Sequence, residues 1–266
     1  MAINFFQVSR FVFHFFISRR KGHGAHSPFL YQLCEEVFYN DSEFYAFSRL
    51  ARLRKELLSN TDTILVDDLG AGSKTFKDRS RIISDIAEKG ISSKRQNETL
   101  YRLINRLGCK TSVELGTSLG LNALYMASVD HGNQVISVEG SRALYSFAKD
   151  LAQKNGFKNV KIINGNFDEI LPDLLKDIPG LDLLYIDGNH RYEPTLRYFE
   201  LALTRKHNNS VFVFDDIYWS SEMQRAWKKI SQHPEVTMCV DTFYSGYVFF
   251  RKEIREKVYS RIYLPL

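Results

Sequence analysis

A glycine-containing turn between two apolar segments is the strongest local signal of ligand binding in this sequence. Residues 113–122 read VELGTSLGLN and pass from strand-like into helix-like sequence. Gly116 and Gly120 have no side chain, so a ligand can approach the backbone of the turn between them. The two glycines are four residues apart, so the dinucleotide fingerprint G-x-G-x-x-G is not met and nothing here indicates a pyrophosphate.

Two further segments carry groups that suit a nucleoside. Glu139 ends the apolar run 134–138, 19 residues after Gly120, and a carboxylate there can accept hydrogen bonds from both hydroxyls of a ribose. The segment 164–168 reads NGNFD, and its amide and aromatic side chains at Asn166 and Phe167 suit an adenine ring. The alternatives are a solvated acid at a strand end and an ordinary Asn-Gly turn.

Three carboxylates and a histidine form another group. Asp187 follows one apolar run, and Asp215 with Asp216 follows the next. Because the carboxyl ends of parallel strands share one edge of a sheet, we expect the three to converge, and clustered oxygen ligands suit Mg²⁺. His190, three residues after Asp187, is a candidate general base. The alternatives are carboxylates that cap helices or bind backbone amides, and a solvated loop histidine.

The elements that must position these groups alternate regularly after about residue 94. Strand-like runs cover residues 111–115, 134–138, 160–163, 181–186 and 210–214, and helix-like sequence covers residues 98–107, 122–129, 141–155 and 193–206. This alternation predicts βαβ units and an α/β fold with a parallel sheet. Residues 236–240 and 247–250 flank Ser245-Gly246 and predict an antiparallel hairpin at the end.

Residues 1–93 have a different texture and are interpreted as a helical N-terminal extension before a domain of residues 94–266. A charged helix is expected over residues 48–58 and a basic loop over residues 73–94. Residues 5–21 are aromatic and end in Arg19-Arg20-Lys21, so they are either buried against the domain or a second subunit, or lie on a membrane surface. We favour burial, because the next segment is aromatic too. The extension is expected to form a lid, the acceptor side of the pocket or a dimer contact.

Composition narrows the classes of protein. The 266 residues are 44% hydrophobic and 25% charged with a formal net charge of +5, which excludes a disordered, collagen-like or disulfide-scaffold protein. Cys34, Cys109 and Cys239 form no C-x-x-C motif, and His23 and His26 have no third ligand nearby, so a reducing cytoplasm and no structural zinc are expected. No run of about 18 apolar residues indicates a membrane span, and no signal peptide is recognisable.

Taken in order, the motifs resemble those of class I S-adenosylmethionine-dependent methyltransferases, in the branch of the catechol and caffeoyl-coenzyme A O-methyltransferases. The resemblance covers about residues 94–250 and rests on E-x-G-x-x-x-G at residues 114–120, Glu139, and the segments 165–167, 185–190 and 214–217. It implies a Rossmann-like, doubly wound sheet of seven strands, mostly parallel, with an antiparallel C-terminal hairpin. Two departures are His190, where metal-dependent members often have Lys, and Asn208-Asn209, where the family usually has Gly-Gly.

The resemblance also implies a reaction and its site. S-adenosylmethionine would donate its methyl group in line to an oxygen of a small-molecule acceptor, with divalent-metal assistance as an open question. Asp187 and His190 would be catalytic, and Asp187, Asp215 and Asp216 would hold Mg²⁺ or another divalent cation. The cofactor would bind at Glu114, Gly116, Thr117, Ser118, Gly120, Asn122, Glu139, Gly140, Asn166, Phe167 and Asp187.

Other functions stay open at this point. The basic balance makes an RNA or protein methyltransferase an alternative. No Asn-Pro-Pro-Tyr signature follows the fourth strand, so nucleic acid is not expected as a partner. A non-catalytic, membrane-associated adenosyl-binding protein is the other alternative, and a homodimer is compatible with the sequence. The segment 66–73, VDDLGAGS, imitates a methyltransferase glycine loop, but the basic residues after it lack the apolar helix that should follow.

Overall fold

The computed structural model describes residues 5–18, 27–66 and 80–264. These residues fall into two compact units, one drawn from residues 1–40 and 178–265 and the other from residues 41–177. The glycine turn and Glu139 belong to the second unit, and the three aspartates with His190 belong to the first. The imitation glycine loop at residues 66–73 lies almost entirely outside the described residues.

The second unit contains three of the parallel strands that the sequence predicts. They are hydrogen-bonded in the order β3 (Thr111–Leu115), β4 (Gln134–Glu139) and β5 (Val160–Asn164). The helices of this part of the unit are α5 (Lys94–Leu107), α6 (Leu121–Ala127), α7 (Arg142–Lys154) and α8 (Phe167–Asp177). Local sequence sets their ends, because Ser93 begins α5 with a capping box and left-handed Gly108 ends it.

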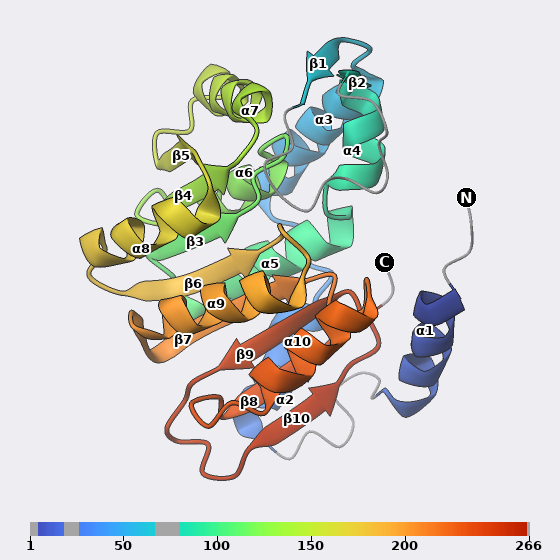
Figure 1. Cartoon of the computed structure of the whole chain (residues 1–266), viewed down its shortest axis with the longest axis vertical. Coiled ribbons are helices and arrows are strands. Elements are labelled where there is room, and N and C mark those ends of the chain that lie inside the picture. Colours follow the sequence, from blue (N-terminus) through green and yellow to red (C-terminus); the bar gives the residue numbers. More distant parts are fainter. Residues whose placement is uncertain (1–4, 19–26, 67–79, 265–266) are drawn as a thin grey trace. The chain divides into compact units, whose positions relative to one another are not determined.

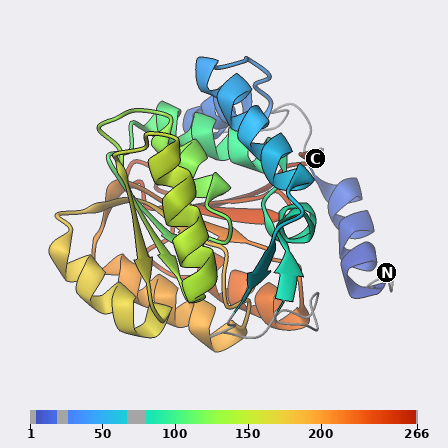
Figure 2. The same cartoon turned by 90° about the horizontal axis from the view of Figure 1, so that it is seen from above.

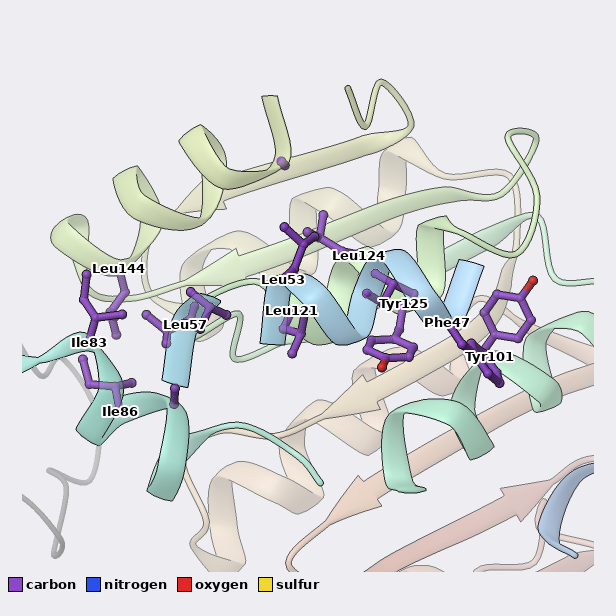
Figure 3. Packing of buried hydrophobic residues seen from close by; sticks show 14 of the residues in the cluster. Phe47, Leu53, Leu57, Ile83, Ile86, Tyr101, Leu121, Leu124, Tyr125 and Leu144 are labelled. Carbon is purple, nitrogen blue, oxygen red and sulfur yellow. The ribbon is translucent and has the colours of Figure 1, made fainter. Parts of the chain in front are cut away.

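Residues 41–93 share a core with the helix that follows the glycine turn. Figure 3 shows Phe47 and Leu53 of α3 (Tyr45–Ser59) packed with Leu124 and Tyr125 of α6 in one hydrophobic cluster. The helix expected at residues 48–58 is confirmed. The prediction of a basic loop over residues 73–94 is wrong for residues 80–90. These residues form β2 (Ser80–Ile82) and α4 (Ile83–Gly90), and β2 pairs antiparallel with β1 (Thr63–Leu65). Ile83, Ile86 and Ala87 bury one face of α4 in the same cluster.

The first unit contains five strands, hydrogen-bonded in the order β10-β8-β9-β7-β6. They are β6 (Leu181–Ile186), β7 (Lys206–Asp215), β8 (Met238–Asp241), β9 (Ser245–Phe249) and β10 (Val258–Arg261). The predicted β8–β9 hairpin is confirmed, and β9 also pairs antiparallel with β7. The seven-strand expectation is wrong by one, because the short strand β10 adds an eighth beside β8. The helices α9 (Tyr192–Leu203) and α10 (Ser221–Ser231) complete this part.

The N-terminal segment packs in the first unit, where it forms α1 (Phe5–Ile17), α2 (Pro28–Leu33) and a single π-helical turn, η1 (Cys34–Phe38). Figures 1 and 2 show α1 as a separate helix at the outer side of this unit. Phe29 stacks edge-on against Phe249 and Phe38 against Tyr247, so α2 and η1 are anchored on β9. No helix within the described residues is both long and apolar enough to cross a membrane.

Candidate active site

The turn between β3 and α6 has the backbone that its glycines predict. Gly116 and Gly120 have φ angles of 106° and 87°, and Ser118 between them has a φ of 50°. A β-carbon on Gly120 would lie 2.9 Å from the β-carbon of Ala148, so the turn passes directly against α7. Three positive φ angles within five residues are unusual, and such backbone is concentrated at ligand-binding turns.

Gly120→Ala is expected to lower the free energy of unfolding by about 2–4 kcal/mol, because it adds a clash with Ala148 to the strain of a positive φ. Gly156→Ala is the matched control, since Gly156 lies in the same unit with a φ of 67° and no atom within 4 Å of an added β-carbon. That variant should lose about 1 kcal/mol. Urea unfolding measures both, and equal losses would show that the approach to α7 is unimportant.

Glu139 is held at the end of β4 by two backbone N–H groups. Its Oε2 accepts a hydrogen bond from the N–H of Ser118 at 2.8 Å, and its Oε1 accepts one from the N–H of Ser141 at 2.9 Å. Burial raises the pKa of Glu139, while these N–H donors act in the opposite direction. Each carboxylate oxygen can accept a further hydrogen bond, so the fixed side chain can still receive two ribose hydroxyls.

The predicted adenine segment lies beside Glu139. The N–H of Gly165 donates to the Glu139 carbonyl at 3.0 Å, and Asn164 Nδ2 donates to the carbonyls of Glu139 and Gly140. Asn166 accepts the N–H of Asp168 at 3.0 Å and so begins α8, in which Phe167 is the first residue. The segment that begins at Asn164 therefore lies beside Glu139 and Gly140, and the contact of Asn166 and Phe167 with an adenine stays a prediction.

Glu114 lies beneath the turn and is fully buried. Its Oε1 accepts a hydrogen bond from Asn122 Nδ2 at 2.7 Å, and its Oε2 accepts one from the Ser137 hydroxyl, which also contacts the hydroxyl of Thr117. Burial raises the pKa of Glu114 to about 8. This environment indicates that Glu114 holds the turn in place. Asn122 Oδ1 is buried and has no hydrogen-bond partner within the described part of the chain, so it suits a donor such as a ligand ammonium group.

The raised pKa of Glu114 predicts a pH dependence of stability. The unfolded carboxyl ionises near its ordinary value of 4.5 and the folded one near 8, so its contribution is fully present below 4.5 and is lost as the pH rises toward 8. Glu114→Gln does not titrate. Its unfolding free energy relative to the native protein should therefore rise by about 1–3 kcal/mol between pH 5 and pH 8. Glu169→Gln, on the exposed side of α8, is the control, and a difference independent of pH would contradict the expectation.

In the first unit, His190 lies between two aspartates. Its Nε2 is 3.6 Å from Asp187 Oδ1 and 3.9 Å from Asp216 Oδ2. Asn189 and Asp216 have φ angles of 54° and 55°, so the turns after β6 and β7 both use left-handed backbone. Burial lowers the pKa of His190, partly offset by the charge of Asp215. An imidazole that is neutral at pH 7 can accept a proton.

Asp215 accepts hydrogen bonds from two hydroxyl groups. Its Oδ2 accepts a hydrogen bond from the Tyr185 hydroxyl at 3.0 Å and its Oδ1 accepts one from the Ser245 hydroxyl at 2.7 Å. Burial raises the pKa of Asp215 to about 6. Each oxygen of this carboxylate thus accepts one hydrogen bond from a hydroxyl group and keeps a second lone pair. No group of three or more His, Cys, Asp or Glu side chains among residues 5–18, 27–66 and 80–264 has the arrangement of a metal site.

Tyr185 and Ser245 are the site residues that sequence reasoning missed. Tyr185, in β6, begins the 185–190 motif, but no role for its hydroxyl was predicted from the sequence. Ser245 is placed by register alone, because it pairs with Asp215 across the antiparallel β7–β9 ladder. The sequence does not show which strands pair, so the hydroxyl of Ser245 could not be assigned to Asp215 before the β7–β9 pairing was known.

Part of the chain is similar in sequence to a known protein family and to a viral protein. The family model of a methyltransferase domain matches residues 113–217, from β3 to just after β7. An uncharacterized protein of Acanthamoeba polyphaga mimivirus is 35% identical over 69 residues, which cover 24% of this chain and 31% of the viral protein. The match thus spans about a third of the length of that relative.

Solved structures are similar over a larger share of the chain. The O-methyltransferase TomG of Streptomyces achromogenes, solved with SAM, has a TM-score of 0.55 at 18% identity over 79% of this chain and 91% of its own. An O-methyltransferase of Bacillus cereus, solved with SAH, has a TM-score of 0.52 at 16% identity over 79% and 92%. An SAH-bound methyltransferase of Podospora anserina has a TM-score of 0.53 at 14% identity over 80% and 100%.

At these identities the solved structures establish the fold, and the family model identifies the domain. The resemblance that the ordered motifs predict is confirmed. Residues 113–217 match the model of a methyltransferase domain, and the chain has the Rossmann-like fold of the solved methyltransferases.

Proposed function

We propose that this protein binds S-adenosylmethionine in its second unit and transfers the methyl group to a hydroxyl oxygen of a small-molecule acceptor. The observation that carries the proposal is the Glu139 carboxylate, fixed by the N–H groups of Ser118 and Ser141 beside a glycine turn. That carboxylate offers a ribose two acceptor oxygens at the carboxyl end of β4, where ligands of such sheets bind. The two O-methyltransferases of similar fold support the choice of acceptor atom.

The residues of the second unit would bind and orient the cofactor. When bound, S-adenosylmethionine supplies an electrophilic methyl group on its sulfonium. Gly116 and Gly120 let the cofactor approach the backbone, and Asn122 Oδ1 would accept a hydrogen bond from its ammonium group. Asn166 and Phe167 would lie along the adenine. The fixed geometry lowers the entropy cost of an in-line displacement.

The residues of the first unit would prepare the acceptor. A phenolic hydroxyl has a pKa near 10 and is a poor nucleophile at neutral pH, so a base must remove its proton. His190 Nε2 would take that proton, and the carboxylates of Asp187 and Asp216 would stabilise the imidazolium that results. A contact of Asp187 with the cofactor stays a prediction.

Divalent-metal assistance stays a second mechanism for the same reaction. The position of His190 Nε2 near Asp187 and Asp216 supports the histidine base as the first mechanism. Asp187, Asp215 and Asp216 are the residues that would hold a cation in the metal-assisted mechanism.

A small acceptor is favoured over a polyanion by the distribution of charge. Residues 35–266 contain 32 basic and 31 acidic residues, so the part of the chain that carries the proposed site has almost no excess positive charge. Binding of nucleic acid normally depends on such an excess. A protein acceptor and a homodimer stay untested predictions.

The proposal is tested in two steps. Titration calorimetry should show binding of S-adenosylmethionine and S-adenosylhomocysteine but not of NAD, because the turn lacks the dinucleotide spacing. Incubation with a panel of phenols and catechols should then release S-adenosylhomocysteine. Absence of cofactor binding would refute the whole proposal, whereas binding with transfer to RNA or protein only would refute the small-molecule acceptor.

A further inference from the structure

Helix α1 is attached to the first unit by one of its faces. His14 is buried, and its Nε2 lies 3.0 Å from Oδ1 of Asp241 at the end of β8. The ring of Phe11 packs edge-on against Phe243, and that of Phe15 packs against Tyr263 in the same way. These contacts confirm burial for this face of the helix.

The opposite face of α1 is apolar and exposed. Phe16 is 78% exposed and Phe13 is 55% exposed, and the other exposed large hydrophobic side chains of the helix are Val8, Val12 and Ile17. At 100° per residue, positions 8, 12 and 16 form one stripe, with positions 13 and 17 beside it. We call these five residues the outer face of α1. Five large apolar side chains clustered within three turns exceed the scattered apolar residues normal on a protein surface.

The net positive charge of the chain is concentrated in the part of the sequence that contains this helix. The first 34 residues contain Arg10, Arg19, Arg20 and Lys21 and no acidic residue, so they carry +4 of the formal net charge of +5. The remaining residues are almost neutral. An apolar helix face in a segment with only basic charge has the chemistry of a peptide that binds the interface of an anionic bilayer.

We propose that the outer face of α1 docks on the surface of an anionic lipid membrane. Its 13 residues make a helix of about 20 Å, which is shorter than the roughly 30 Å of a bilayer core, so it would lie flat in the interface. His14 and Phe11 would keep the helix joined to the first unit. A second copy of this chain is a poorer partner, because two segments of +4 would repel each other. The inference is independent of the methyl acceptor.

The test is sedimentation of the full chain with phosphatidylcholine vesicles, with and without 30% phosphatidylglycerol. We expect at least tenfold stronger binding to the anionic vesicles, and weaker binding as salt rises from 0.05 to 0.5 M. Phe13→Ser/Phe16→Ser should reduce binding at least tenfold without changing the midpoint of urea unfolding. Tyr45→Ser/Leu58→Ser is the control, because it removes two exposed apolar side chains of α3 in the other unit.

Three results would overturn the proposal. One is equal binding to neutral and anionic vesicles, or no binding to either. The second is an equal loss in the two double variants, which would mean that the outer face of α1 has no special part. The third is a dimer in sedimentation equilibrium that Phe13→Ser/Phe16→Ser dissociates, which would assign this face to a second copy of the chain.

Discussion

Replacing Glu139 by Gln is expected to weaken the binding of S-adenosylmethionine by about 10- to 100-fold, or about 1.5–3 kcal/mol. A hydrogen bond to a charged acceptor contributes on that scale, and the neutral amide cannot accept from both ribose hydroxyls and both N–H groups. The Ser118 or Ser141 N–H group would face an NH₂ group, so the turn would also be less well fixed. Titration calorimetry gives the dissociation constants directly.

The ribose contact can be separated from an effect on the turn. Asp150→Asn, an exposed carboxylate change on α7, is the matched control and should leave affinity unchanged. The cost of Glu139→Gln should largely disappear for 2′,3′-dideoxy analogues of S-adenosylhomocysteine, because they have no ribose hydroxyl to lose. The same cost with and without the hydroxyls would mean that Glu139 acts only by holding Ser118 and Ser141.

Much of the fold could be predicted, because the periodicity of the second half is strong. The run at residues 181–186 is β6 with the expected bounds, and the hairpin around Ser245-Gly246 forms β8 and β9. The elements that the sequence analysis missed, β10 and α4, have weak sequence patterns. Strand β10 has four residues and only Ser260 is buried. Helix α4 was hidden by basic neighbours, although Ile83, Ile86 and Ala87 have helical spacing.

The candidate site was predictable in position but not in orientation. The spacing of Gly116, Gly120 and Glu139 placed the turn and the carboxylate correctly. The same pattern could not show that Glu114 points beneath the turn to Asn122 and Ser137, since both faces of a parallel sheet are covered and either is plausible for an acid. The direction of each side chain depends on register and on neighbouring strands.

The N-terminal segment shows why composition alone was ambiguous. Its aromatic residues cover most of the helix surface, so burial and an interfacial position both agreed with the sequence. In the structure Phe11 and His14 pack inward while Phe13 and Phe16 point outward. One helix therefore carries both features that the sequence had presented as alternatives.

The largest effect is expected at His190. His190→Ala should reduce kcat for methyl transfer by about 10²–10⁴-fold, because a general base contributes on that scale. The affinity for S-adenosylmethionine should stay unchanged, because His190 is not among the residues proposed to bind the cofactor. Rates are measured as S-adenosylhomocysteine release with the best phenol or catechol of the panel. His207→Ala is the control, since His207 also lies beside an aspartate, with Nε2 2.9 Å from Asp182 Oδ1 in the same unit.

Asp215→Asn and a chelator distinguish the two mechanisms. If His190 is the base, EDTA should leave the rate unchanged, and Asp215→Asn should cost less than tenfold, because an amide can still accept a hydrogen bond from Tyr185 or Ser245. If a cation prepares the acceptor, EDTA should abolish transfer, Mg²⁺ should restore it, and Asp215→Asn should cost more than His190→Ala. Transfer that survives both substitutions and chelation would contradict both mechanisms, because neither the histidine base nor a cation held with Asp215 would then be needed to prepare the acceptor.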